Sequence, residues 1–487
     1  MPEGGPGPQA KIEQIDVLEL LTSLCDRSLV ASQKESQPRY RLLETVRQYG
    51  RDLLYDSEES VERRNIHRDH FLALAEEAAP QLKGSSQLQW LAHLEEEHEN
   101  MRAALEWSIH GDGSEEALRL AYSLVLFCWR LGYIAEGREW CVRAAATPVG
   151  KQRTTWRARV LNGAGMLSWL QGEYAEGKLY YEESYDILRE TGDRQCLAEC
   201  SYGLALVAFG LDDYASAQKY IHDGYVIAQE VGDLWYVAGI GYFLGILKRI
   251  QGDFEGALDL YKESIAIYRK LGDRIGLAYP VYDIGLAEYY RGNLDAARAY
   301  LNESLTIRRD TKDLWGIAES LFGLGLVAVG KGEIETAKRF LADANKVARE
   351  VGDKTRVAIS LHWLGCVSLT EGDPIAARNL IDESFAIYRA LEDRWGMAHS
   401  LAGYAALAAQ SGDPILAVRL WAASDKVREV IGSPLPPIER ARRDQELATA
   451  KSALGSEVFF QAHREGSEWT QEQAIENCLA PSLLPSS

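Results

Sequence analysis

The sequence predicts an all-α fold, a solenoid of helix–turn–helix units stacked at a fixed period. The first observation behind this prediction is a turn that recurs every 40 residues without insertion, at Gly132, Gly172, Asp212, Gly252, Gly292, Gly332, Gly372 and Gly412. The second is a small residue seven positions before nearly every turn and another five positions after it. A fixed period of this size indicates a stacked repeat array, in which each unit buries its apolar face against its neighbours.

The small residues allow the two helices of one unit to cross closely. Before the turns they are Gly165, Ala205, Gly245, Gly285, Gly325, Gly365 and Ala405, with Val125 as the exception in the first unit. Large apolar residues follow each turn at Tyr181, Ile221, Tyr261, Leu301, Leu341, Ile381 and Trp421. This spacing is typical of tetratricopeptide repeats whose helices exceed the usual period of about 34 residues. We therefore expect a tetratricopeptide-repeat superhelix over residues 113–431.

The joints between units carry a second recurring signal. Asp193, Asp233, Asp273, Asp313, Asp353 and Asp393 occupy the same position at six joints. An aspartate there accepts hydrogen bonds from the first N–H groups of the next helix, so we interpret the six as N-caps rather than a metal or catalytic array. Replacing Asp273 by alanine is then expected to cost about 1 kcal/mol.

The remaining segments divide as follows. Residues 1–12 are Pro/Gly-rich and are expected to be a disordered tail. Residues 13–55 are expected to form helix, strand, turn, strand and helix, the last part of a winged-helix unit. Residues 56–112 are expected to form a helical linker, and residues 432–487 a C-terminal cap of three shorter helices.

Three segments carry a family resemblance. LLTSLCDRSLV (20–30), RYRLLETVRQY (39–49) and HENMRAALEW (98–107) resemble the winged-helix and early repeat segments of bacterial STAND-class signal-transduction ATPases, including LuxR-type and related transcriptional regulators. The resemblance implies a P-loop ATPase module, in cis before residue 13 or in trans, as a partner. It also implies that the winged-helix segment acts mainly as a hinge against that module.

Composition limits the classes of partner. The net charge of -19 opposes phosphate binding, and residues 13–52 hold six basic and seven acidic side chains, so the sequence argues against direct nucleic-acid contact. Seven scattered cysteines do not form a disulfide framework. No signal peptide or apolar run long enough to span a membrane is present. We expect a cytoplasmic protein with no membrane partner.

The sequence offers no catalytic, cofactor or metal site. Residues 172–179 match a phosphate-binding loop in part, but Leu179 replaces the hydroxyl residue that would bind magnesium, and Gly172 and Gly177 are repeat positions. His67 and His70 lie one helical turn apart without further metal ligands. We therefore expect no enzyme activity.

Variable residues on the first helix of each unit carry the functional prediction. Two adjacent positions of the repeat face the concave groove, and aromatic side chains there suit an extended peptide or a helix. The predicted groove residues are Tyr202, Tyr242, Tyr279, Tyr282, Tyr289, Phe322, His362, Glu199, Glu319 and Arg159. Packing between repeats is the alternative explanation of the same residues.

Three function hypotheses follow. The first is a non-enzymatic scaffold, the sensor half of a regulator that binds a protein, a peptide or a small inducer in the groove. The second is a DNA-binding transcriptional regulator. The third is a fragment of a larger ATP-hydrolysing enzyme whose P-loop module precedes residue 1.

Overall fold

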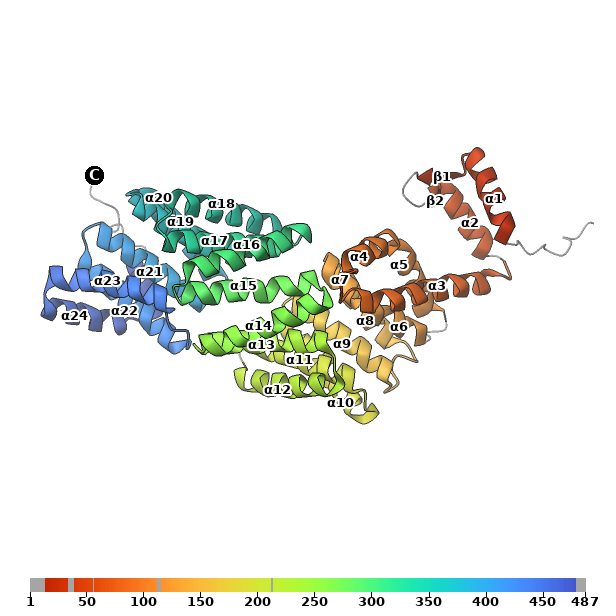
Figure 1. Ribbon diagram of the computed structural model, residues 1–487, viewed down its shortest axis with the longest axis horizontal. Helices are drawn as coiled ribbons and strands as arrows, with labels where there is room; N and C mark the ends of the chain where they lie inside the picture. The colour runs from red at the N-terminus through yellow and green to blue at the C-terminus, as the bar shows by residue number, and fades with distance from the viewer. Residues whose placement is uncertain (1–13, 34–38, 56, 112–114, 212, 479–487) are drawn as a thin grey trace, which may run out of the picture.

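The computed structural model describes residues 14–33, 39–55, 57–111, 115–211 and 213–478. Within them the chain forms a long superhelix of antiparallel helix pairs, with a small helix–strand–strand–helix unit projecting from one end (Figure 1). The predicted tail lies outside the described residues, as do Ser114 and the turn residue Asp212. The all-α solenoid predicted from the 40-residue period is confirmed.

The N-terminal unit consists of α1 (Gln14–Asp26), β1 (Val30–Gln33), β2 (Arg39–Leu42) and α2 (Glu44–Tyr55). The two strands are antiparallel, with Val30 opposite Leu42 and Gln33 opposite Arg39. The order of elements agrees with the sequence, whereas their identification as part of a winged helix stays a prediction. Three helices then lead to the array, α3 (Ser60–Gln81), α4 (Gln87–Glu96) and α5 (His98–His110).

Eight helical units follow. The first has a divided inner helix, α6 (Glu115–Ser123) and α7 (Val125–Leu131), followed by α8 (Ile134–Ala146). The division falls next to Val125, the one bulky residue at the position that is small in the other units. The other units are α9 (Thr155–Leu170) with α10 (Tyr174–Thr191), α11 (Arg194–Gly210) with α12 (Tyr214–Val231), α13 (Leu234–Ile250) with α14 (Phe254–Leu271), α15 (Arg274–Tyr290) with α16 (Leu294–Asp310), α17 (Leu314–Gly330) with α18 (Ile334–Val351), α19 (Lys354–Thr370) with α20 (Pro374–Ala390) and α21 (Arg394–Gln410) with α22 (Pro414–Val430).

The chain ends in α23 (Pro437–Leu454), α24 (Ser456–Ser467) and α25 (Gln471–Cys478). Three helices were expected here, but the expectation that all are short was wrong. α23 has 18 residues and equals the helices of the array in length. It begins at Pro437, which suits the first position of a helix because its missing N–H has no intrahelical partner there.

The small and large positions of the repeat meet inside each unit. A Cβ atom added at Gly165 would lie 2.8 Å from the Tyr181 ring, and one at Gly285 would lie 2.8 Å from Leu301. The second helix therefore approaches the first more closely than any side chain at the glycine would allow. Serines add a regular hydrogen bond from the second helix to a carbonyl of the first: Ser184, Ser264, Ser304, Ser384 and Ser424 donate to Ala158, Ala238, Ala278, Ala358 and Ala398.

The joints are capped as predicted. All six aspartates accept a hydrogen bond from an N–H in the first turn of the next helix, for example Asp393 from Gly396 at 3.0 Å. Asp213, Asp253, Asp373 and Asp413 cap second helices in the same way, which the sequence analysis did not anticipate. The residue before the joint has a positive φ, and Lys312 and Glu392 adopt it where no glycine is present.

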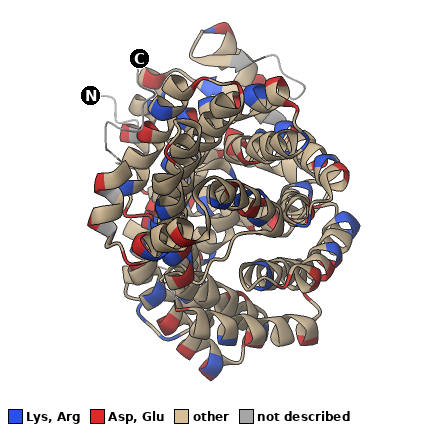
Figure 2. Ribbon diagram, turned by 90° about the vertical axis from the view of Figure 1, so that its left-hand side faces the viewer, with Lys and Arg blue, Asp and Glu red and all other residues tan. Residues whose placement is uncertain are grey.

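Charged residues of both signs are spread over the superhelix (Figure 2). Many of them pair between neighbouring units, with partners one repeat apart in the sequence. Such pairs are Arg138–Glu176, Arg153–Glu190, Arg269–Glu303, Arg274–Asp310, Arg298–Glu333 and Arg349–Glu383. Because they are partly exposed, each contributes at most about 1 kcal/mol, and they mainly fix the register between units. No helix among the described residues is long and apolar enough to cross a membrane.

Candidate partner-binding face

The first helices of the units form the inner layer of the superhelix. In Figure 1, α10 and α12 run along one outer edge and α16, α18 and α20 along the other, with α13 and α15 between them. The inner helices are accordingly the more buried ones, as α15 and α17 show. The predicted groove residues all lie on inner helices, from α9 to α19.

The structure separates these residues into two groups. Tyr202, Tyr242 and Tyr279 are partly exposed, as are the charged residues of the set, Arg159, Glu199 and Glu319. Tyr282, Tyr289, Phe322 and His362 are buried, each with an exposed fraction of 6% or less. For these four the structure shows packing between repeats, the alternative that the sequence left open. A role in partner binding stays a prediction for the set as a whole.

A partly buried hydrogen-bond network joins the inner helices near the middle of the array. The Tyr242 hydroxyl donates to Asp283 Oδ2 at 2.6 Å, and Arg249 lies 3.4 Å from Asp283 Oδ1. Arg249 also donates to the Tyr261 hydroxyl at 3.3 Å. Burial, together with the negative charge of Asp283, raises the pKa of Tyr242 well above its ordinary value, so this hydroxyl stays protonated and acts as a donor.

One repeat further on, Glu319 lies between two arginines. Arg308 Nη1 is 3.0 Å from Glu319 Oε2, and Arg356 Nη2 is 2.9 Å from Glu319 Oε1. The Arg308 guanidinium covers the Tyr282 ring at 4.9 Å, and Arg356 covers Phe322 at 5.0 Å. Burial raises the pKa of Glu319, although both arginines oppose this rise. Tyr282 and Phe322, which were predicted to face a partner, are thus covered by the guanidinium groups of Arg308 and Arg356.

Arg308 was not among the predicted site residues, although a comparison of equivalent positions in the repeats could have found it. It occupies a position near the end of the second helix where other units have Tyr268 and Tyr388. In each case the next inner helix has a glycine beneath the large side chain, and a Cβ at Gly316 would lie 2.5 Å from Arg308. Where the second helix instead has a small residue there, the inner helix supplies the large one, as with Ala348 and Arg356. The pairing of a glycine with a large residue eight positions earlier is visible in the sequence.

Segments at both ends of the chain cover parts of the inner layer. Near the N-terminus, Lys83 lies over the Trp235 and Tyr236 rings at 4.7 and 4.6 Å, and Arg130 Nη2 lies 3.6 Å from Asp273 Oδ2. Figure 1 accordingly shows α7 beside the beginning of α15. These contacts join residues more than 140 positions apart in the sequence and close the superhelix on itself.

At the other end, α23 crosses the inner helices of the last units. Arg442 lies over Trp363 of the inner helix α19 at 5.4 Å, and Glu446 accepts a hydrogen bond at 3.1 Å from Trp421 Nε1 of the second helix α22. Ile438 reaches α17, where its Cδ1 atom would be 3.5 Å from a Cβ atom at Gly330. The helices that carry the partly exposed tyrosines Tyr202, Tyr242 and Tyr279 are themselves contacted from the N-terminal side. Tyr122 contacts Glu199 of α11, Lys83 contacts α13, and Arg130 contacts the cap of α15.

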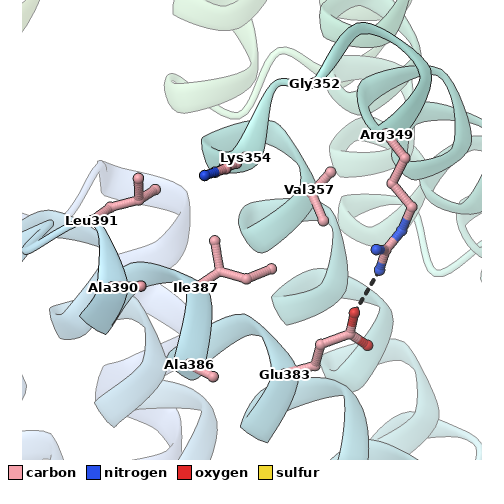
Figure 3. Close-up of a pocket in the computed structure, with 9 residues that line it drawn as sticks. All are labelled: Arg349, Gly352, Lys354, Val357, Glu383, Ala386, Ile387, Ala390 and Leu391. Atoms are coloured by element: carbon pink, nitrogen blue, oxygen red, sulfur yellow. Dashed lines mark hydrogen bonds and ion pairs between the residues drawn. The ribbon is translucent and has the colours of Figure 1, made fainter.

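A separate shallow hollow of about 660 Å³ lies between α18, α19 and α20 (Figure 3). Val357 and Ile387 form its apolar floor, and the Arg349–Glu383 ion pair, at 2.6 Å, lies along one side. No predicted groove residue lines it. The hollow is the seam between two adjacent second helices, and its side chains do not bring together a nucleophile and a base.

Among the described residues, no group of three or more His, Cys, Asp or Glu side chains could hold a metal ion. The cysteines of the array, such as Cys196 and Cys200, are buried, and burial raises the pKa of both thiols, which disfavours the reactive thiolate.

Comparison with known proteins supports the repeat assignment. A tetratricopeptide-repeat family model matches residues 237–310. The array consists of tetratricopeptide repeats. A second family model, that of anaphase-promoting complex subunit 5, matches residues 161–251 and 288–371, again within the array.

Relatives match about a third of this chain. A protein named "Putative HTH-type transcriptional regulator" in Mycobacterium tuberculosis is 38% identical over 169 residues, and its Mycobacterium bovis counterpart gives the same values. The match covers 33% of this chain and 18% of the relative's length. Among solved structures, the STAND protein with a tetratricopeptide-repeat sensor from Pyrococcus horikoshii aligns with a TM-score of 0.53 and 15% identity, over 92% of this chain and 60% of that chain. At this identity the likeness shows the fold alone.

Proposed function

We propose that the array is a non-enzymatic binding scaffold, the sensor part of a bacterial signal-transduction ATPase or transcriptional regulator. The observation that carries the proposal is a row of three partly exposed tyrosines, Tyr202, Tyr242 and Tyr279, which lie on successive inner helices next to charged groups. Tyrosine combines a large rigid contact area with a polar hydroxyl, which suits a peptide or protein segment that runs across successive repeats.

The regulatory half of the proposal goes beyond the scaffold itself. It is supported by the name of the mycobacterial relatives and by the fold shared with the STAND protein. In this proposal an ATPase module, in cis or in trans, adopts two states, and the ligand binds the array more tightly in one of them. Only such a difference in affinity can shift the ATPase between its states.

The experiment compares substitutions on the inner face with one on the outer face. Tyr202→Ala and Tyr279→Ala each remove a partly exposed ring from the proposed surface, whereas Tyr214→Ala removes an exposed ring from α12. Affinity capture with the purified chain as bait should recover a partner with the wild type and Tyr214→Ala, and lose it with the double variant. Circular dichroism and thermal unfolding confirm that each variant is folded. Equal capture by the double variant would contradict the proposed face.

A further inference from the structure

The inner layer around Tyr279 contains buried positive groups whose hydrogen-bonding capacity is not used. Among the described residues, Arg130 Nε, Nη1 and Nη2, Arg308 Nε and Nη2, and Arg356 Nε are buried and have no hydrogen-bond partner. A buried donor without a partner loses its interaction with water and gains nothing in return. Such groups are normally satisfied by protein, water or a ligand, so a concentration of them points to a missing partner.

Arg130 is the most incompletely satisfied of the three. Its side chain is 3% exposed, stacks on Trp129 at 4.5 Å, and has Asp273 as its nearest acid, at 3.6 Å. Asp273 already accepts from the Gly276 N–H and from Trp235 Nε1, both at 2.7 Å. The carboxylate of Asp273 therefore provides a counter-charge for Arg130 but no hydrogen bond.

Arg308 lies near the ring of Tyr279. Its guanidinium carbon lies 5.6 Å from the Tyr279 ring centre. Its Nη1 atom donates to Gly316 O at 2.6 Å and pairs with Glu319, whereas Nε and Nη2 have no hydrogen-bond partner. Asp313 lies 3.9 Å from Arg308 Nε, beyond hydrogen-bond distance, and its other oxygen caps the next helix. Arg130 and Arg308 both act on the Tyr279 hydroxyl, whose pKa burial raises and the two cations lower.

We propose that Arg130, Tyr279 and Arg308, with Arg356 beside them, form a subsite that binds a carboxylate. This inference rests on the proposed binding function and names its ligand chemistry. A carboxylate presents two oxygens to the planar fork of a guanidinium and would satisfy the unpaired nitrogens with charge-assisted hydrogen bonds. A single negative charge suits the site because Asp273, Asp313 and Glu319 lie close by and would repel a doubly charged phosphate.

One side of the subsite is less deeply buried than the other. Tyr279 is partly exposed, and the Arg356 and Glu319 side chains are 17% and 12% exposed, while Arg130 and Arg308 lie deeper. A ligand can therefore enter past Tyr279 and Arg356. The carboxylate can belong to a peptide C-terminus or to a small organic acid, and the experiment below distinguishes these sources.

The test follows the arginine side chains directly. The Nε–H signals of the ¹⁵N-labelled chain are assigned to Arg130 and Arg308 by their loss in the Arg130→Gln and Arg308→Gln variants. Titration with acetate should shift both signals saturably, with a dissociation constant of about 1 to 100 mM, while acetamide leaves them unchanged. Arg138→Gln, which removes an outer-face arginine paired with Glu176, serves as the matched control and should keep the response.

Further probes identify the source of the carboxylate. A short acetylated peptide that shifts these signals at lower concentration than succinate, and loses the effect when its C-terminus is amidated, indicates a peptide terminus; the reverse order indicates an organic acid. The proposal would be overturned if acetate shifted neither signal, or if inorganic phosphate bound more tightly than acetate. It would also be overturned if the indole signals of Trp129 and Trp235 responded to acetate as strongly in Arg130→Gln as in the wild type. The wild-type contrast between acetate and acetamide remains decisive if a variant fails to fold. Because it does not depend on partner capture, this test can fail while the capture experiment succeeds.

Discussion

Replacing Asp273 by alanine should destabilise the array far more than an ordinary cap substitution. The sequence alone predicts a loss of about 1 kcal/mol, because the residue is an N-cap. In the structure Asp273 is fully buried and also accepts a 2.7 Å hydrogen bond from Trp235 Nε1, which loses its partner in the variant at a cost of about 1 to 3 kcal/mol. Arg130 additionally loses its nearby acid. The total expected loss is about 3 to 5 kcal/mol.

The assay compares this variant with Asp393→Ala. Asp393 caps the last of the six joints through the Gly396 N–H at 3.0 Å and is partly exposed, so its replacement isolates the cap contribution. Urea unfolding of both variants is followed by circular dichroism and by tryptophan fluorescence. It gives the loss in free energy of unfolding at each of two sites in the same array. Long arrays can unfold in more than one step, so the comparison uses the transition that includes Trp235. Equal losses for the two variants would refute the reasoning, because the contacts to Trp235 and Arg130 would then contribute nothing.

Three further substitutions, one of them with a matched control, test the packing and a buried histidine. Gly245→Ala places a Cβ 2.5 Å from the Tyr261 ring and should destabilise the array by about 1 to 3 kcal/mol, whereas Gly50→Ala in α2, with free space around it, should be neutral or stabilising by up to about 1 kcal/mol. Ser384→Ala removes the bond to the Ala358 carbonyl and should cost about 1 kcal/mol, measured by thermal unfolding. Burial, with nearby Arg442 and Arg428, lowers the pKa of His362 to about 3, so the unfolded chain binds an extra proton below about pH 6.5 and stability falls as pH drops towards 3. His362→Gln should flatten this dependence in unfolding measured from pH 7 to 4; an unchanged slope would contradict it.

Local rules made the fold predictable from the sequence. The turn glycines, the cap aspartates and the small residues each follow from backbone geometry or from the space between two helices, and they recur with one phase. The residues that line the inner layer do not follow such a rule. Whether Tyr282 or Tyr242 is exposed depends on which side chain lies above it. Tyr282 is covered by Arg308, which lies 26 positions later in the sequence, near the end of α16.

The covered ends of the inner layer also lay beyond local reasoning. Arg130 and Asp273 are 143 positions apart, and nothing in either repeat signals their contact. The same holds for α23, whose sequence predicts a polar helix after the array and does not indicate that it returns across α17 and α19. Superhelical curvature decides both contacts, and it accumulates from small rotations between units that no single residue specifies.

The contacts at the two ends of the chain restrict where on the inner layer a ligand can bind. In the last units, Trp363 of α19 already contacts Arg442 of α23, so a ligand that spanned the whole inner layer would have to replace this contact. A ligand confined to the central units leaves this contact in place and meets the tyrosines and the unsatisfied arginines. Binding there would add hydrogen bonds to Arg130, which belongs to the first unit of the array, and to Arg308, which belongs to its middle. A carboxylate between them would therefore strengthen the contact that closes the superhelix, and this coupling provides a physical route from ligand binding to the position of the first unit.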